Sequence, residues 1–266
     1  MQSLEFHNVT LNYDAPKRGE AGLLALENLD LVLDGGQSIA IIGPSGCGKS
    51  STLQMAAGLL QPTSGSVTVD GEPIVRPRQS TALILQDFGL LPWKTVIKNA
   101  ELGLKVRGIA RDERRKRARE ALALVGLAGF EDTYPDGLSG GMQQRLALAR
   151  SLALDVDLLL MDEPLSALDA LLREQLQDTL LELWKNEGYA QVLVTHSIEE
   201  AVYLGQRVYV LAPRPGHVVD VVENPHMGDK AYRGSDEFFA LCTRIRSALH
   251  RTSSEAEGHG EVLPHA

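Results

Sequence analysis

Hydrophobic positions along the chain fall into short runs separated by longer stretches with the spacing of amphipathic helices. Residues 38–42 form a continuous apolar run, which is typical of a buried strand, whereas residues 4–11 alternate between apolar and polar side chains. Strands that alternate with helices favour a mostly parallel sheet covered on both faces. The predicted strands are residues 4–11, 28–33, 38–42, 66–70, 81–85, 158–161, 191–195, 207–211 and 217–222, the last two forming a hairpin.

The stretch between Trp93 and Gly137 lacks strand signals and is rich in charge, so we interpret residues 93–140 as a helical insertion. Basic side chains crowd residues 111–120 within it. They could form a patch for nucleic acid or lipid headgroups, but acidic neighbours dilute the charge and favour a solvated helix face. The apolar side of this predicted helix is Ala118, Ala121, Leu122 and Val125.

The regular pattern ends after Glu223, which divides the chain into a main domain at residues 1–223 and a C-terminal part at residues 224–266. Residues 235–250 predict one helix, and residues 251–266 have the composition of a disordered tail. We expect no large regulatory domain after Glu223.

Composition limits the partners of the protein. A chain of 266 residues with 44% hydrophobic content fits one large α/β domain, and 5% aromatic content makes its core mainly aliphatic. Asp plus Glu (35) exceed Lys plus Arg (26), which gives a net charge of −9. The field of an acidic chain repels phosphate backbones, so we expect no nucleic-acid partner and expect any phosphate to be held by local backbone geometry.

The apolar runs and the cysteines bear on the compartment. Runs such as residues 38–43 and 156–161 are far shorter than the ~20 residues of a membrane span, so we expect the protein to act from outside the bilayer. Cys47 and Cys242 lie too far apart to suggest a disulfide framework or a metal site, and a reducing cytosol is the simplest compartment.

A phosphate-binding loop is the first chemical signal. Residues 43–50 fit the P-loop pattern, follow the apolar run at 38–42 and precede a helical stretch at 50–59. Backbone N–H groups of such a loop point into one concavity, Lys49 can reach the β- and γ-phosphates of ATP, and the Ser50 hydroxyl can ligate Mg²⁺. The residues expected to cradle the phosphates are Gly43, Pro44, Ser45, Gly46, Cys47, Gly48, Lys49, Ser50 and Ser51.

Cys47 lies inside this loop, close to a predicted helix N-terminus, which favours the thiolate. We therefore expect the thiol to be alkylated readily and to be protected by ATP.

Two carboxylates end the apolar strand predicted at residues 158–161. In P-loop proteins an Asp at the position of Asp162 holds Mg²⁺, usually through water. Side chains alternate along a strand, so Glu163 is expected to point elsewhere and to act as general base on the attacking water.

A second motif resembles the signature of ABC-type ATPases. It reads Leu138-Ser139-Gly140-Gly141-Met142-Gln143-Gln144-Arg145 and lies upstream of the Asp162-Glu163 strand, as in that family. The resemblance runs from about Leu4 to Glu223. It implies an α/β fold with a P-loop NTPase core, a mostly parallel sheet, an N-terminal antiparallel β region and a helical insertion.

Further family motifs follow in order, and the roles below are implied by the resemblance. Tyr13 matches an aromatic that stacks on adenine, and Gln86 matches a glutamine that joins Mg²⁺ to the membrane-facing subdomain. Residues 166–169 match a loop that crosses a dimer interface, and His196 matches a histidine that contacts the γ-phosphate. The implied catalytic residues are Glu163 and His196, and the implied metal-binding residues are Ser50, Gln86 and Asp162. The other implied ATP contacts are Tyr13, Ser51, Gln86, Ser139, Gly140, Gly141, Gln143 and Asp169.

The family also implies partners: a homodimer in which each P-loop faces the signature of the other copy, integral membrane permease subunits, and indirectly an external solute-binding protein. Residues 86–93 and the proline-rich turn at 212–216 resemble the branch that serves nitrate, alkanesulfonate and taurine importers. The implied location is the cytoplasmic face of the inner membrane, with the protein attached peripherally.

Two other functions compete with the transport motor. A soluble ABC-type ATPase acting on nucleic acid or ribosomes usually carries two cassettes or long coiled insertions, and the chain shows neither. A P-loop kinase would have no need for the motif at residues 138–145. Co-purification with a permease would separate the first alternative from the motor, and a stoichiometric phosphorylated product would support the second.

Overall fold

The computed structural model describes residues 1–13 and 22–258, and a six-stranded sheet forms its centre. The strand order is β10-β9-β3-β8-β7-β6, in which β9 and β10 pair antiparallel and all other neighbours pair parallel. The prediction of a mostly parallel sheet with a closing hairpin is confirmed. The strands are β3 (Ser38–Ile42), β6 (Thr81–Ile84), β7 (Leu158–Asp162), β8 (Ala190–Thr195), β9 (Arg207–Leu211) and β10 (Val218–Glu223).

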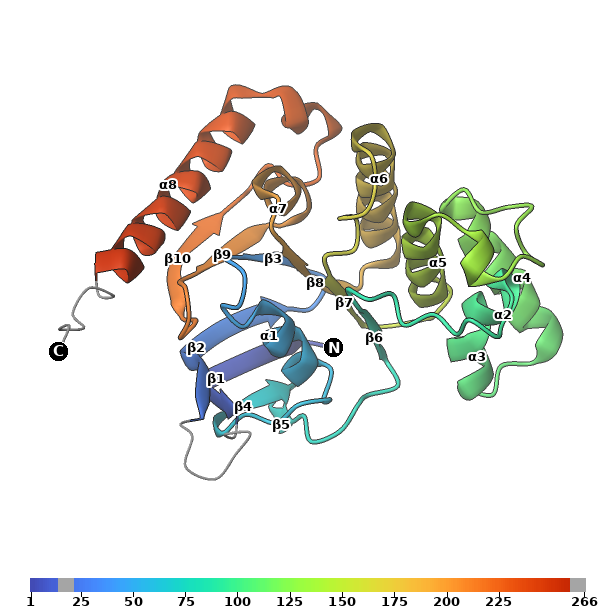
Figure 1. The fold of residues 1–266 in the computed structure, drawn as a ribbon, viewed down its shortest axis with the longest axis horizontal. Helices are drawn as coiled ribbons and strands as arrows, with labels where there is room; N and C mark the ends of the chain where they lie inside the picture. The colour runs from blue at the N-terminus through green and yellow to red at the C-terminus, as the bar shows by residue number, and fades with distance from the viewer. Residues whose placement is uncertain (14–21, 259–266) are drawn as a thin grey trace, which may run out of the picture.

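A second, antiparallel sheet has the order β2-β1-β4-β5. Helix α1 (Lys49–Ala56) lies between the two sheets (Figure 1). Leu53 and Met55 of α1 share a buried cluster with Phe6 of β1 and Ile41 of β3. The strands of this sheet are β1 (Ser3–Tyr13), β2 (Leu23–Asp34), β4 (Ser64–Val69) and β5 (Glu72–Pro73).

Strand β7 divides its side chains between the two faces of the central sheet. Leu158 and Leu160 belong to the cluster on the α1 side, whereas Leu159 and Met161 belong to the cluster on the other side. Side chains alternate along a strand, so Asp162 shares the face of Leu158 and Leu160. The first carboxylate after the apolar run is therefore directed toward the helix that follows the phosphate-binding loop.

Helices cover the other face of the central sheet and extend to one side of it. Figure 1 shows α2 to α5 grouped beyond β6, in the region expected as a helical insertion. The predicted apolar face of α4 is buried at Ala118, Ala121, Leu122 and Val125, as expected for a helix with one solvated face. The helices are α2 (Val96–Ala100), α3 (Leu102–Val106), α4 (Arg111–Leu124), α5 (Gly140–Leu152), α6 (Ala170–Glu187), α7 (Ile198–Leu204) and α8 (Asp236–Gly258), with short 3-10 helices at Pro135–Gly137 and Lys230–Gly234.

Helix α8 extends further than the sequence pattern predicted. The expectation of disorder from Arg251 onward is wrong up to Gly258, because α8 continues to that residue. Ile245, Ala248 and Thr252 are all buried, so the stripe that holds α8 against the domain continues past the predicted end of the helix. Residues 259–266 of the expected tail lie outside the described residues. Within the described part of the chain, no helix combines the length and apolar character needed to cross a membrane.

Candidate nucleotide-binding site

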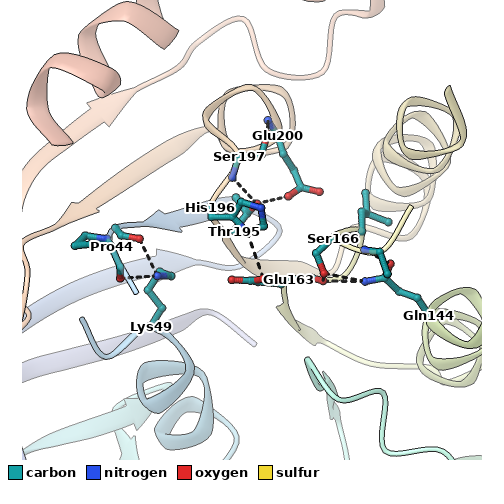
Figure 2. Close-up of polar contacts among 12 residues, drawn as sticks. Pro44, Lys49, Gln144, Glu163, Ser166, Thr195, His196, Ser197 and Glu200 are labelled. Carbon is teal, nitrogen blue, oxygen red and sulfur yellow. Dashed lines mark hydrogen bonds and ion pairs between the residues drawn. The ribbon is translucent and has the colours of Figure 1, made fainter. Parts of the chain in front are cut away.

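The loop between β3 and α1 packs closely against its neighbours. Gly48 has φ of 96°, and a Cβ there would lie 2.4 Å from a methyl carbon of Leu26. The Lys49 side chain folds back over the loop, where its Nζ donates to the carbonyl oxygens of Gly43 at 2.8 Å and Pro44 at 2.9 Å (Figure 2). A cation that is only 8% exposed therefore lies in the curve of the loop, beside a helix N-terminus that favours anions.

A pocket of about 470 Å³ adjoins this loop. It collects residues that follow β3, β6, β7 and β8, at the carboxyl ends of parallel strands, where open α/β sheets bind ligands. Most of its lining was predicted from the sequence, but Ile42 and Leu249 were not. The lining residues are Ile42, Gly43, Pro44, Ser45, Lys49, Gln86, Glu163, His196 and Leu249.

Asp162 lies at the base of the site and is only 7% exposed. Burial raises the pKa of its carboxyl, and the Ser50 hydroxyl partly offsets this effect through a hydrogen bond. Its Oδ1 is buried without a hydrogen-bond partner among the described groups. An unpartnered buried oxygen beside a hydroxyl oxygen suits a hard cation.

Glu163 turns away from Asp162 because its backbone adopts a φ of 50°, which is unusual for a residue other than glycine. Its N–H donates to the carbonyl oxygen of Val194 at 2.9 Å. Its Oε2 lies 3.3 Å from Nδ1 of His196, and the side chains are 19% and 66% exposed, respectively. The carboxylate is therefore shielded on one side and faces the pocket beside an accessible imidazole.

The turn that carries His196 is held by a network that the sequence analysis missed. The Thr195 hydroxyl donates to the buried carboxylate of Glu200 and accepts from the N–H of Ser197 (Figure 2). The Ser197 hydroxyl caps α7 by accepting from the N–H of Glu200 at 3.2 Å. Burial raises the pKa of Glu200, which the hydroxyl of Thr195 partly offsets. The Ser-x-x-Glu spacing of a helix start was the signal available in the sequence.

Several predicted residues do not line the pocket of their own chain. Tyr13 lies near the loop, with its hydroxyl 3.0 Å from Oγ of Ser51. Ser139 caps α5 by accepting from the N–H of Met142, and Asp169 caps α6 by accepting from the N–H of Leu172. The resemblance assigns a further set of residues to ATP held by a second copy across a dimer interface. These residues are absent from the described pocket lining: Ser139, Gly140, Gly141, Gln143 and Asp169.

The expectation of a reactive thiol at Cys47 is wrong. The residue is fully buried, and burial raises the pKa of the thiol despite the nearby Lys49 ammonium. Gly216 from the proline-rich turn packs so closely that a Cβ there would lie 1.9 Å from the carbonyl oxygen of Cys47. The turn therefore covers this side of the loop, which local sequence could not reveal.

These features define a P-loop nucleoside triphosphatase: a glycine-rich loop with a buried lysine, and an acidic strand end beside it. The sequence model for the ABC transporter family matches residues 26–166, and the chain belongs to this family.

Relatives extend over most of the chain. It is 48% identical to the taurine import ATP-binding protein TauB of Burkholderia thailandensis over 219 residues, which cover 82% of this chain and 83% of that protein. It is 41% identical to the ATP-binding protein BruAb2_1123 of Brucella abortus over 263 residues, which cover 97% and 98% of the two chains. The dimeric structure of MJ0796, a bacterial ABC transporter cassette, matches with a TM-score of 0.77 and 34% identity, covering 84% of this chain and 100% of that one.

We predict that both cysteines of the folded protein react slowly with iodoacetamide at pH 8, with or without ATP. Cys47 is buried, and burial raises the pKa of Cys242 to about 11 from its ordinary 9.0, which alone lowers the thiolate fraction of Cys242 about 100-fold. Mass spectrometry of labelled peptides measures the rates, with guanidinium-unfolded protein as the control. Rapid labelling of Cys47 in the folded chain would contradict its burial.

Proposed function

We propose that this chain is the ATP-binding and ATP-hydrolysing subunit that powers an ABC importer. The observation that carries the proposal is the pocket in which Lys49, Gln86, Glu163 and His196 meet above the glycine-rich loop. A cation for phosphate, a carboxylate for water and an imidazole on the open side form the set of groups that phosphoryl transfer to water needs.

Lys49 and the loop hold the triphosphate in this proposal. When ATP binds, the Lys49 ammonium exchanges the carbonyl oxygens of Gly43 and Pro44 for oxygens of the β- and γ-phosphates. Backbone N–H groups of the loop and of the first turn of α1 bind the remaining charge. The ring of Tyr13, held near Ser51, offers a face on which adenine stacks.

Ser50, Gln86 and Asp162 fit Mg²⁺. Their hydroxyl, amide and carboxylate oxygens are the donors this ion takes, and the unpartnered Oδ1 of Asp162 is a buried acceptor in need of a positive charge. When bound, Mg²⁺ neutralises part of the charge that develops on the phosphates.

Glu163 is the proposed general base. Its carboxylate accepts the proton of the water that attacks the γ-phosphorus, and the contact of its Oε2 with Nδ1 of His196 at 3.3 Å keeps it directed into the pocket. The exposed His196 ring donates a hydrogen bond to the γ-phosphate. In Figure 2 Glu163 lies between Lys49 and Gln144, so phosphate held by the lysine is on the side of the carboxylate that faces the pocket.

The working form in this proposal is a homodimer with ATP at the interface. Ser139, Gly140, Gly141 and Gln143 contact ATP held by a second copy, and the loop that contains Asp169 crosses the interface. The dimeric MJ0796 cassette supports this arrangement, as does the exposed N-terminus of α5, which is suited to a phosphate. Two-fold symmetry repeats the contact and closes the assembly.

We further propose that the dimer binds integral membrane permease subunits at the cytoplasmic face of the inner membrane and is linked through them to an external solute-binding protein. The similarity to the taurine import protein TauB supports taurine or a similar small solute as the cargo, and residues 86–93 and 212–216 resemble the branch that also serves nitrate and alkanesulfonates. Co-expression with permease subunits tests this proposal, with stimulation of ATP hydrolysis in vesicles by solute and binding protein as the readout. A soluble ATPase acting on nucleic acid or ribosomes would instead be stimulated by RNA or ribosomes and would not co-purify with a permease.

Lys49→Ala and Glu163→Gln should fail at different steps. Lys49→Ala removes the cation in the loop and should weaken ATP binding on the order of 100-fold or more, because a charge-assisted phosphate contact is lost from a shielded site.

Glu163→Gln should bind ATP normally, hydrolyse it on the order of 100-fold or more slowly, and accumulate as a dimer, because the proton acceptor is lost. Nucleotide titration, phosphate release and size-exclusion chromatography with Mg-ATP measure these quantities. A Glu163→Gln protein that turns over at the normal rate would exclude the carboxylate as base.

Mixed dimers test which residues share one site. In the first dimer, Lys49→Ala is in one subunit and Ser139→Arg is in the other, so face-to-face pairing puts both lesions in one site and leaves one site intact. In the second dimer, one subunit carries both substitutions beside a normal subunit, so each site is damaged. We predict more ATP hydrolysis from the first dimer. The opposite order, measured on differently tagged and doubly purified dimers, would mean that Lys49 and Ser139 of one chain serve the same site.

A further inference from the structure

Gln144 is a buried amide that the mechanism above does not use. It lies on the second turn of α5 and is only 2% exposed. Its Nε2 donates to the carbonyl oxygen of Glu163 at 3.0 Å, and its Oε1 accepts from the N–H of Ala167 at 2.9 Å. Both ends of the amide therefore bind the segment that leaves β7. Figure 2 shows Gln144 on the side of Glu163 away from Lys49.

Ser166 completes this arrangement. Its hydroxyl donates to the same carbonyl oxygen of Glu163 at 3.1 Å and lies 3.4 Å from Nε2 of Gln144. The carbonyl of Glu163 thus accepts three hydrogen bonds: two from the hydroxyl and the N–H of Ser166, within its own turn, and one from Gln144 of α5.

The backbone of Glu163 needs such support. Its φ of 50° is disfavoured for a residue with a Cβ, and such a conformation persists only where the surroundings fix it. The N–H of Glu163 is fixed by the carbonyl oxygen of Val194 at 2.9 Å. Gln144 and Ser166 fix its carbonyl, so the peptide groups on both sides of the Cα are held, and the direction of the carboxylate follows from them.

We propose that Gln144 is a positioning residue for ATP hydrolysis: its side-chain amide holds the strained turn at Glu163 so that the carboxylate faces the attacking water. This inference rests on the proposed role of Glu163 as general base. The same amide orders the N–H of Ala167, at the beginning of the loop that leads to Asp169. Gln144 therefore acts on the rate of the chemical step and not on the contacts that ATP makes with Lys49 and the loop of the same chain, which lie on the other side of Glu163.

Gln144→Met tests the proposal, because methionine has a similar length but makes neither hydrogen bond. We expect kcat for ATP hydrolysis by the full-length protein to fall on the order of 10–100-fold, as misplacement of a catalytic group does, while KM and the Kd for ATP change less than about twofold. Gln191→Met is the matched control: Gln191 is also fully buried and donates to the Ser38 hydroxyl at 2.8 Å, at the opposite end of the strands from the pocket. This control should lower thermal stability and leave kcat within about twofold of the parent.

Ser166→Ala provides an independent test that does not depend on replacing a core side chain, because Ser166 is exposed. It removes the hydroxyl donor to the carbonyl oxygen of Glu163, while the N–H of residue 166 still donates at 3.4 Å, and should lower kcat several-fold with KM unchanged. If Gln144→Met does not fold, as judged by circular dichroism, this variant decides the question. A normal kcat in the folded Gln144→Met protein overturns the proposal. If only Ser166→Ala folds, a normal kcat in that variant overturns it.

A double-mutant comparison identifies the route of the effect. If Gln144 acts through the Glu163 carboxylate, Gln144→Met added to Glu163→Gln should slow hydrolysis less than about twofold further. An equal effect in both backgrounds overturns the proposal. If Glu163→Gln alone hydrolyses ATP at the parent rate, Glu163 is not the general base. This failure can be distinguished from a failure of the Gln144 proposal, because the Glu163→Gln protein keeps Gln144 unchanged.

Discussion

The phosphate-binding loop has no spare room on the side away from its pocket. A Cβ at Gly48 would lie 2.4 Å from Leu26 of β2, and a Cβ at Gly216 would lie 1.9 Å from the carbonyl oxygen of Cys47. Strand β2 and the turn that contains Gly216 therefore both meet the loop and fix its curvature. Because α1 begins directly after the loop and is packed between two sheets, the direction of its N–H groups is fixed as well. The other site residues act on a ligand whose position this packing determines.

The end of β7 directs two adjacent carboxylates into different surroundings, although the charge of Glu163 still contributes to the raised pKa of Asp162. Asp162 keeps the alternation of the strand and faces α1, where burial raises its pKa. Glu163 leaves the strand with a positive φ and faces His196. Adjacent residues thus reach different surroundings: one is suited to a cation and the other to a proton. Separation of this kind is how one short acidic motif supports two chemical roles.

Much of the fold and most of the pocket lining could be predicted from the sequence, because both depend on local patterns. The strand at 38–42 with the glycine-rich loop after it, and the apolar run before Asp162, need no tertiary information. The burial of Cys47 could not be predicted, since it arises from the turn that contains Gly216. The length of α8 depends on the packing of residues such as Thr252, which overrides the polar local composition. The contacts of Gln144 join residues 19 to 23 positions apart, and no spacing rule indicates them. The roles of Ser139 and Asp169 stay predictions because they require a second chain.

The two hydrogen bonds between Lys49 and the loop have a thermodynamic consequence. Nζ already donates hydrogen bonds to the carbonyl oxygens of Gly43 and Pro44. An anion that binds this ammonium must replace them, so the net free energy it gains is the difference between the new hydrogen bonds and the two that are lost. A small anion that engages Lys49 alone has little with which to offset that exchange. In the proposed site a triphosphate also reaches the backbone N–H groups of the loop, so its binding free energy is spread over many contacts. On this proposal the loop favours a ligand with several phosphate groups over an anion that reaches Lys49 alone.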